Sequence, residues 1–250
     1  RKIGLEVMEP EEGFLACGYS GKGRFPDPED IVQRVEVILG QDGDFRGKKV
    51  LITAGPTREP IDPVRFITNH SSGKMGYALA QKAVLRGARV ILVTGPTDIK
   101  PPAGLDKIIT VETAKEMYNA VMESFDWSDI VIKSAAVADF SPKVYTGEKI
   151  KKQEFSMCIN LRANPDILRE LGAKKEHQIL VGFAAETGDA EKNAIDKLRR
   201  KNLDLIVLND VTAEGAGFVS DTNVVKILHK DGRIEKLPKM LKVDLADKIL

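Results

Sequence analysis

The sequence is poor in cysteine and histidine, with two cysteines and three histidines in 250 residues. Cys17 and Cys158 lie far apart without metal-ligand spacing, which is typical of a reducing cytosol. We therefore expect a cytoplasmic protein without a structural disulfide. His70, His177 and His229 are scattered and form no Ser/His/Asp or metal-binding pattern. We interpret His177 and His229 as surface residues.

The sequence also lacks an excess of charge and a long apolar run. It has 38 Lys and Arg against 37 Asp and Glu, so its net charge of +1 predicts neither nucleic acid nor an anionic membrane as partner. No apolar run approaches the length that crosses a bilayer, and no apolar segment of a signal peptide follows Arg1. With 42% hydrophobic and 30% charged residues, the chain is typical of one large globular α/β domain, alone or with an appendage.

Two standard nucleotide-binding fingerprints are missing as well. GxGxxG does not follow the first predicted strand, and Gly73-Lys74 is followed by Met75 where a P-loop has Ser or Thr. Residues 66–76, FITNHSSGKMG, are nevertheless rich in small polar groups before a predicted helix. Such a loop suits an anion, although the same letters also cap a helix without any ligand. The long connection over residues 55–72 favours a functional loop.

The N-terminal segment differs from the rest of the chain. Glycines and prolines break it into turns, so residues 1–23 are expected to be disordered or ordered only against a partner. A helix is predicted from Pro28 to about Gly40, followed by a polar linker. We therefore divide the chain into residues 1–46, a leading segment with its linker, and residues 47–250, the main domain.

From Lys49, short β-branched runs alternate with amphipathic helical patterns. Residues 223–237 are predicted to form a β-hairpin about Asp231-Gly232, and the tail from Pro238 to Leu250 a final helix. The alternation predicts an α/β fold with a Rossmann-like, doubly wound, mainly parallel sheet, helices on both faces and a C-terminal β-hairpin. The predicted strands are 49–55, 89–96, 129–137, 178–187 and 204–211, and the predicted helices are 73–88, 113–125, 164–172 and 189–203.

Sheets of this kind bind ligands at the carboxyl ends of their strands, near the point where the strand order reverses. The loops at five strand ends should therefore gather along one edge: Gly55, Gly95, Ala135, Phe183 and Asn209.

The stretch SAAVADFSPKVYTGEKIKK, residues 134–152, combines small, acidic and basic residues. Ala135 and Ala136 would allow a planar ring to lie against the backbone. Asp139 suits a hydroxyl or a Mg²⁺ ion held by phosphates, and equally the cap of a turn. A lysine run such as that at Lys149 is usually a solvated face, but a lysine on a mobile arm can also close over a triphosphate.

Two further patterns are ambiguous by themselves. NPDILRELG predicts a helix with Asn164 as N-cap and Pro165 at its first position, which is a routine helix start. Lys197 and Lys201 share one face of a predicted helix, where most lysines bind nothing.

Taken in order, these stretches resemble the phosphopantothenoylcysteine synthetase family, also called phosphopantothenate–cysteine ligase. The resemblance runs from about Lys49 to the C-terminus through ITAGPTREPIDPVRFITNHSSGKMG, AAVADF, EKIKK, NPDI, VGFAAET and KNLDLIVLNDV. The leading PEEGFLACGYSGKGR is similar to the substrate-clamp end of the phosphopantothenoylcysteine decarboxylase domain, a flavoprotein fused ahead of the synthetase in most bacteria.

This resemblance implies a CTP-dependent ligase of coenzyme A biosynthesis that works with Mg²⁺. The carboxylate of 4′-phosphopantothenate would attack the α-phosphate of CTP, release pyrophosphate and form an acyl-cytidylate, from which the amine of L-cysteine displaces CMP. The family is dimeric, so a homodimer is expected, and a larger oligomer in a full-length protein. FMN would belong only to the decarboxylase domain, which is mostly absent from this chain.

The resemblance also implies roles for single residues. Asn69 would polarise the acyl carbonyl, because its amide donates to developing negative charge, and Lys149 would stabilise the triphosphate and the intermediate. Cys17 matches the decarboxylase proton donor and would act only in an intact protein. Lysine donors facing a pyrimidine carbonyl would favour cytosine over adenine. The expected nucleotide-binding residues are Gly55, Ser71, Ser72, Gly73, Ala135, Ala136, Asp139, Lys149, Asn164, Pro165, Asp166, Ile167, Phe183, Lys197 and Lys201, with Asp139 also reaching Mg²⁺ through the phosphates.

Two other classes of function remain open. A dinucleotide-binding oxidoreductase is compatible with the fold alone, but it needs a GxGxxG turn and an acidic residue at the end of the second strand, where Thr94-Gly95 stands. A non-catalytic subunit would show degraded site residues, and none of the motif positions is degraded.

Overall fold

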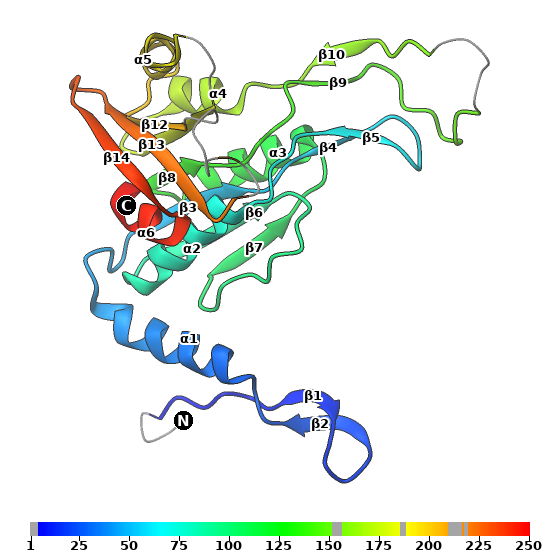
Figure 1. The fold of residues 1–250 in the computed structure, drawn as a ribbon, viewed down its shortest axis with the longest axis vertical. Coiled ribbons are helices and arrows are strands. Elements are labelled where there is room, and N and C mark those ends of the chain that lie inside the picture. Colours follow the sequence, from blue (N-terminus) through cyan, green and yellow to red (C-terminus); the bar gives the residue numbers. More distant parts are fainter. Residues whose placement is uncertain (1–4, 152–156, 186–188, 210–216, 218–219) are drawn as a thin grey trace.

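The computed structural model describes residues 5–151, 157–185, 189–209, 217 and 220–250. Its centre is one large sheet, whose strands in chain order are β3 (Lys49–Ala54), β6 (Arg89–Thr94), β7 (Lys107–Thr110), β8 (Ile130–Lys133), β11 (Ile179–Ala185), β12 (Leu205–Asn209), β13 (Thr222–His229) and β14 (Ile234–Leu241). Their spatial order is β14-β13-β12-β11-β8-β3-β6-β7 (Figure 1).

The order of the strands confirms the doubly wound class. Six strands from β7 to β12 are parallel, and β13 and β14 add an antiparallel hairpin at one edge. From β3 the chain moves outward to β6 and β7, and then returns to build β8, β11 and β12 on the other side. The order therefore reverses between β3 and β8, and the carboxyl ends of these two strands mark the expected place for a ligand.

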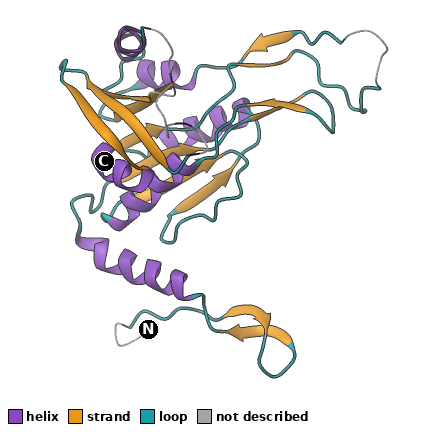
Figure 2. Ribbon diagram, in the orientation of Figure 1, coloured by secondary structure: helices purple, strands orange, loops and turns teal. Residues whose placement is uncertain are grey.

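Helices cover both faces of the sheet (Figure 2). α2 (Lys74–Leu85) and α6 (Lys242–Ile249) pack on one face, and α3 (Ala114–Phe125), α4 (Ile167–Lys174) and α5 (Ala190–Arg200) pack on the other. The central strands bury both faces, since Ile52 belongs to the first core and its neighbour Leu51 to the second, each with no exposed surface. This double burial explains why these strands read as continuous apolar runs.

Three smaller elements project from this body. β1 (Glu11–Phe14) and β2 (Ser20–Arg24) form a hairpin that leads into α1 (Pro28–Leu39) and a 3₁₀ turn at Gly40–Asp42, below the sheet in Figure 1. The hairpin differs from the disorder expected of this segment, although most of its side chains are exposed. On the opposite side, the hairpin of β4 (Arg58–Pro60) and β5 (Phe66–Thr68) lies beside the pair of β9 (Phe140–Pro142) and β10 (Leu161–Ala163). Within the described ranges, no helix is long and apolar enough to span a bilayer.

The structure corrects three details of the sequence analysis. The final helix begins at Lys242, because β14 continues through Pro238. Proline is tolerated there since β14 is an edge strand, where one side of the backbone needs no ladder partner. Asn164 does not cap α4; the N-cap is Asp166, whose carboxylate accepts a hydrogen bond from Arg169 N–H at 3.2 Å. His177 is exposed as expected, but His229 is only partly exposed and pairs with Glu235 at 2.7 Å.

The fit of α2 against β3 predicts a stability effect. A Cβ at Gly76 would lie 2.5 Å from the Cβ and 2.9 Å from the Cα of Ala54, so Gly76→Ala must push the helix from the strand. We expect a loss of about 1–3 kcal/mol, seen as a lower melting temperature in circular dichroism. Gly147→Ala, where no atom lies within 4 Å of the added Cβ, should leave the melting temperature unchanged. A Gly76→Ala protein as stable as the wild type would contradict this packing.

Candidate functional site

A cavity of about 300 Å³ opens at the carboxyl edge of the sheet, at the reversal between β3 and β8. The residues that line it come from the loop before α2, the segment after β8, the ends of β11 and β12, and the region around β13 and α6. They are Asn69, Ser71, Gly73, Lys74, Met75, Gly76, Ser134, Ala135, Ala136, Val137, Asp139, Phe183, Ala184, Ala185, Lys197, Asn209, Gly217, Asn223 and Lys242.

The first wall is the entry to α2. Gly73 precedes this helix with a φ of 83°, a left-handed conformation that favours glycine, and its N–H donates to Ser71 Oγ at 3.3 Å. A Cβ at Gly73 would lie 3.4 Å from the Cα of Gly55, so the helix begins close against the end of β3. The first residues of α2 therefore line the cavity, and an α-helix leaves the N–H groups of its first turn without helical partners.

The second wall is the segment after β8, which is bonded to the end of β3. Ala136 N–H donates to the Gly55 carbonyl at 2.9 Å, and Ala138 N–H donates to Thr57 Oγ1 at 3.0 Å. From the other side, Asn164 Nδ2 donates to the Ala138 carbonyl at 2.8 Å. The small residues expected to accept a planar ring are thus held in a fixed backbone conformation.

Asn69 joins the two walls. Its Nδ2 donates to the Ala136 carbonyl at 2.9 Å, while the residue itself is exposed and lines the cavity. This bond uses one of the two amide hydrogens and fixes the direction in which the amide faces. The structure therefore brings Asn69 together with Ser71, Gly73 and Ala135, as the sequence analysis expects.

The far end of the cavity contains Phe183 and Lys197. Lys197 Nζ donates to the Phe183 carbonyl at 3.0 Å, so the ammonium is held at the end of β11. Lys201 does not line the cavity; its Nζ lies 2.8 Å from Asp166 Oδ2 in an ion pair at the start of α4.

Several predicted residues lie outside the cavity lining. Gly55 and Ser72 lie behind the first wall, and Thr97 Oγ1 donates to the Ser72 carbonyl at 3.0 Å. Ile167 is buried in the core with 3% of its surface exposed. The full set outside the lining is Gly55, Ser72, Lys149, Asn164, Pro165, Asp166, Ile167 and Lys201.

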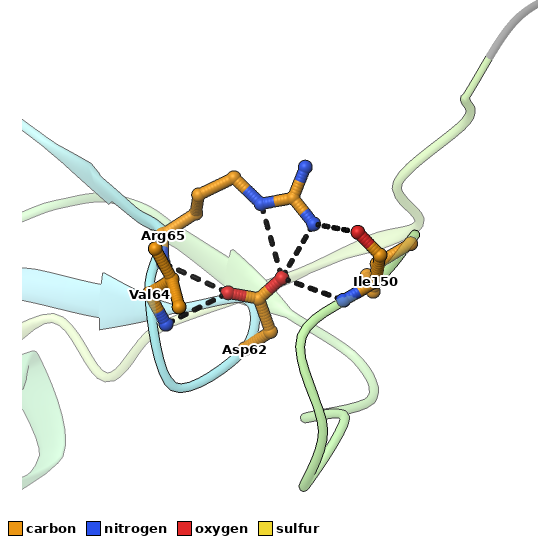
Figure 3. A network of polar contacts seen from close by, with 4 residues as sticks. All are labelled: Asp62, Val64, Arg65 and Ile150. Carbon is orange, nitrogen blue, oxygen red and sulfur yellow. Dashed lines mark hydrogen bonds and ion pairs between the residues drawn. The ribbon is translucent and has the colours of Figure 1, made fainter. Parts of the chain in front are cut away.

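Lys149 is exposed, and the residue after it is held by a polar network (Figure 3). Asp62 Oδ2 accepts from Ile150 N–H at 3.1 Å, and Arg65 Nη2 donates to the Ile150 carbonyl at 2.9 Å. The two side chains pair with each other at 2.5 Å, and the Asp62 side chain has no exposed surface. The hydrogen bond from the Arg65 side chain and those from nearby backbone N–H groups stabilise the ionised carboxylate, so the pKa of Asp62 lies far below its usual range. We call the segment at Lys149 and Ile150 the flap, and we call Asp62 and Arg65, which hold Ile150, the flap clamp.

Lys133 was missed by the sequence analysis. It ends β8 and is buried, with 7% of its surface exposed. Burial, then repulsion from Lys197 and Lys201, lowers the pKa of Lys133 to about 7, with Asp166 and Asp139 opposing the shift. A lysine within the apolar run IVIK was the available signal, because such runs rarely carry a charge.

The remaining predicted residues are placed as follows. Asp139 is the one carboxylate among the described residues that line the cavity, and it is exposed. No group of three or more His, Cys, Asp or Glu side chains that could hold a metal ion occurs in the described part of the chain. Cys17 is a free, exposed thiol in the connection between β1 and β2, and Cys158 is also free and exposed.

Comparison with known proteins identifies the family. The sequence model of the DNA/pantothenate metabolism flavoprotein C-terminal domain matches residues 45–250. The chain belongs to this family.

Relatives within the family agree with the resemblance found in the sequence. The chain is 57% identical over 249 residues to the Coenzyme A biosynthesis bifunctional protein CoaBC of Bacillus subtilis (strain 168), covering 99% of this chain and 61% of that protein. It is 47% identical to a cysteine/cysteine sulfinic acid decarboxylase of an unknown prokaryotic organism, covering 71% of that protein. The crystal structure of the C-terminal domain of a CoaBC protein matches with a TM-score of 0.70 at 47% identity, over 81% of this chain and 92% of that one. The chain thus spans about 60% of the length of the CoaBC proteins it matches.

The flap clamp predicts local protection of backbone amides. Asp62→Ala removes the acceptor of Val64, Arg65 and Ile150 N–H, so these amides should exchange with solvent roughly ten-fold faster or more. Because the folded pKa of Asp62 is depressed, the wild-type clamp should persist at neutral pH and weaken only as the pH falls below the ordinary value of about 4. Hydrogen exchange followed by NMR measures both effects. Asp98→Ala, at an exposed site, is the control, and unchanged protection in Asp62→Ala would show that the clamp does not hold the flap.

Lys133 predicts a pH-dependent stability. Since its folded pKa lies below the unfolded value, the unfolded chain binds more protons between pH 7 and about 10, and the cost of burying Lys133 falls as the pH rises. Lys133→Met should therefore be more stable than wild type at pH 7, by up to about 4 kcal/mol, and the difference should shrink towards pH 10. Urea unfolding across this range measures it, with Lys107→Met on exposed β7 as control. If the difference in unfolding free energy between Lys133→Met and wild type did not change with pH, the lowered pKa of the buried Lys133 would be contradicted.

Proposed function

We propose that this chain joins 4′-phosphopantothenate to L-cysteine with CTP, giving 4′-phosphopantothenoylcysteine, CMP and pyrophosphate, in coenzyme A biosynthesis in the cytoplasm. The observation that carries the proposal is that one cavity at the strand-order reversal unites Asn69, the Ala135–Ala136 wall and Lys197. The 57% identity to a CoaBC protein of coenzyme A biosynthesis supports the same reaction class.

The first step forms the mixed anhydride. The carboxylate oxygen of phosphopantothenate attacks the α-phosphorus of CTP, and the bond to the bridging oxygen breaks, so that its electron pair leaves with pyrophosphate. The N–H groups at the start of α2 and Ser71 would bind phosphate oxygens. Lys149 lies outside the cavity and beside Ile150, so it would neutralise the charge that develops only after the flap clamp releases the exposed segment that carries it and this segment closes over the site.

The second step transfers the acyl group. The neutral amine of cysteine attacks the acyl carbon, and the carbonyl oxygen gains negative charge. The bond between the acyl carbon and the phosphate oxygen then breaks, CMP departs with its electron pair, and the nitrogen loses one proton to solvent as the amide forms. Asn69 would donate to this oxygen with the amide hydrogen that is not bonded to Ala136. The fixed direction of the Asn69 amide supports this role, because a preorganised donor needs no reorientation during the reaction.

Charged side chains in and near the cavity would select the nucleotide base and the metal ion. Lys197 would donate to the cytosine carbonyl, and Lys201 would act indirectly by holding Asp166 at the start of α4. Mg²⁺ supplies charge neutralisation when it is bound to the triphosphate. One carboxylate, Asp139, among the described lining residues fits an ion that arrives with the phosphates better than one bound by the protein alone.

Assembly is part of the proposal. Exposed apolar side chains on the two projecting strand pairs, including Phe66, Phe140 and Leu161, would suit a homodimer contact, and a full-length protein would assemble further. Decarboxylation through Cys17 would need the flavin-binding part of such a full-length protein with its FMN.

The test follows pyrophosphate release by the purified chain with phosphopantothenate, Mg²⁺ and either CTP or ATP, with and without cysteine. We expect release with CTP, and CMP with a cysteine adduct only when cysteine is present. Asn69→Asp should slow the reaction roughly 100-fold or more, because a donor becomes a negative charge. Asn119→Asp, the same change at an exposed site on α3, should not slow it. Release with ATP alone would overturn the cytosine-reading role of Lys197, and no release with either nucleotide would overturn the ligase.

A further inference from the structure

One wall of the cavity has no role in the reaction described so far. It is built from Asn209 at the end of β12, Asn223 at the start of β13, and Lys242 at the start of α6, with Lys74 opposite on α2. We call these four residues the amide-lysine wall. All four lie at the same edge of the sheet as the ends of β3 and β8, because β13 runs antiparallel to β12 and begins where β12 ends.

The two amide side chains of this wall are buried, and their oxygens accept no hydrogen bond from the described residues. Asn209 is 8% exposed and Asn223 is 4% exposed, and the Oδ1 atom of each has no hydrogen-bond partner in the described part of the chain. A buried polar atom without a hydrogen bond destabilises the folded state, and such atoms are rare in native proteins. Two such acceptors lining one cavity indicate a ligand that brings a cation or a bound water to them, or, if the amides are turned over, a ligand whose oxygens accept from their N–H₂ groups.

The charges of the cavity indicate the sign of this ligand. Among the described residues, its lining contains three lysines, Lys74, Lys197 and Lys242, against one carboxylate, Asp139. Lys74 also pairs with Asp221 at 2.6 Å, and Lys242 Nζ donates to the Gly217 carbonyl at 3.0 Å. Burial and the neighbouring Lys74 both lower the pKa of Lys242, so these two ammonium groups repel each other. An anion between them would relieve the repulsion.

We propose that Asn209, Asn223, Lys242 and Lys74 bind the two terminal phosphate groups of the nucleotide and then the pyrophosphate that leaves. This inference rests on the proposed function, in which the bond between the α-phosphorus and the bridging oxygen breaks and its electrons depart with pyrophosphate. The amide-lysine wall stabilises that charge. The Asn side chains can present N–H₂ to phosphate oxygens, or Oδ1 to water and to the cation that accompanies a triphosphate.

The other substrates fit this wall less well. The ammonium group of an amino acid would be repelled by Lys74 and Lys242. The nucleoside has apolar and planar surface that matches Phe183 and the alanine segment at the other walls. Polyphosphate matches both the positive charge and the amide groups.

Calorimetric titration with CTP, CDP, CMP and inorganic pyrophosphate, each with Mg²⁺, tests the wall. Asn209→Ala, Asn223→Ala and Lys242→Met should each weaken pyrophosphate and CTP binding roughly ten-fold or more, while CMP binding changes less than two-fold. Asn119→Ala, an exposed amide on α3, is the matched control and should bind all four ligands as the wild type does. Thermal unfolding shows whether each variant folds.

Several outcomes separate the possibilities. Equal losses for CMP and CTP, or no loss for either, would overturn the terminal-phosphate subsite, as would displacement of pyrophosphate by L-cysteine. If the buried variants do not fold, Lys74→Met decides, because this side chain is 37% exposed: weaker pyrophosphate binding supports the wall and unchanged binding contradicts it. A wild-type protein that binds none of the nucleotides would instead refute the proposed function.

Discussion

The hydrogen bond from Ala136 N–H to the Gly55 carbonyl joins the ends of the two strands between which the sheet order reverses, and the candidate site depends on it. Through it the segment after β8 is held against the loop after β3. The Ala136 carbonyl, held in this way, accepts the hydrogen bond that directs Asn69. The close packing of Gly73 against Gly55 then sets the start of α2 beside the same strand ends. Backbone contacts between three connections therefore create the cavity before any ligand binds.

The charges of the molecule are concentrated by the fold. The chain carries a net charge of only +1, yet Lys74, Lys197 and Lys242 line one cavity and Lys133 is buried next to it. Such a concentration is unfavourable in the free protein and becomes favourable with a polyanion, which shifts part of the stabilisation to the bound state. A net charge near zero gives no global reason to expect nucleic acid as a partner, and it is compatible with a pocket lined by several lysines.

Sequence patterns predicted the longer elements, most of which bury a face, and missed several short or edge strands. β3, β6 and α2 were recognisable because their apolar residues repeat with the period of the structure. β7 was missed because this edge strand leaves Ile108 exposed and gives a weak apolar signal. Pro238 was taken as the start of a helix, although an edge strand also accepts proline.

The candidate site was predicted where one motif supplies its residues, as in the loop from Asn69 to Gly73. It was missed where tertiary contacts assemble it. Asn209 was placed at the edge where the structure has it, but not as part of the cavity lining, and nothing in the local sequence of Asn223 or Lys242 indicates that the β13–β14 hairpin brings them there. Lys201 was expected beside the cytosine, but its ammonium forms an ion pair with Asp166 at the start of α4 and does not line the cavity.

The most direct test of the account is an NMR titration of the isotope-labelled chain with CTP and Mg²⁺, following backbone amide shifts. We expect the largest shifts in Ser71–Gly76, Ala135–Asp139 and Phe183–Ala185, around the cavity at the strand-order reversal. A separate groove of about 400 Å³ lies between α1, α2 and α6, where Gln33, Tyr77 and Ile99 contribute to its lining. Shifts confined to that groove would contradict the central claim that the nucleotide binds at the carboxyl ends of β3 and β8.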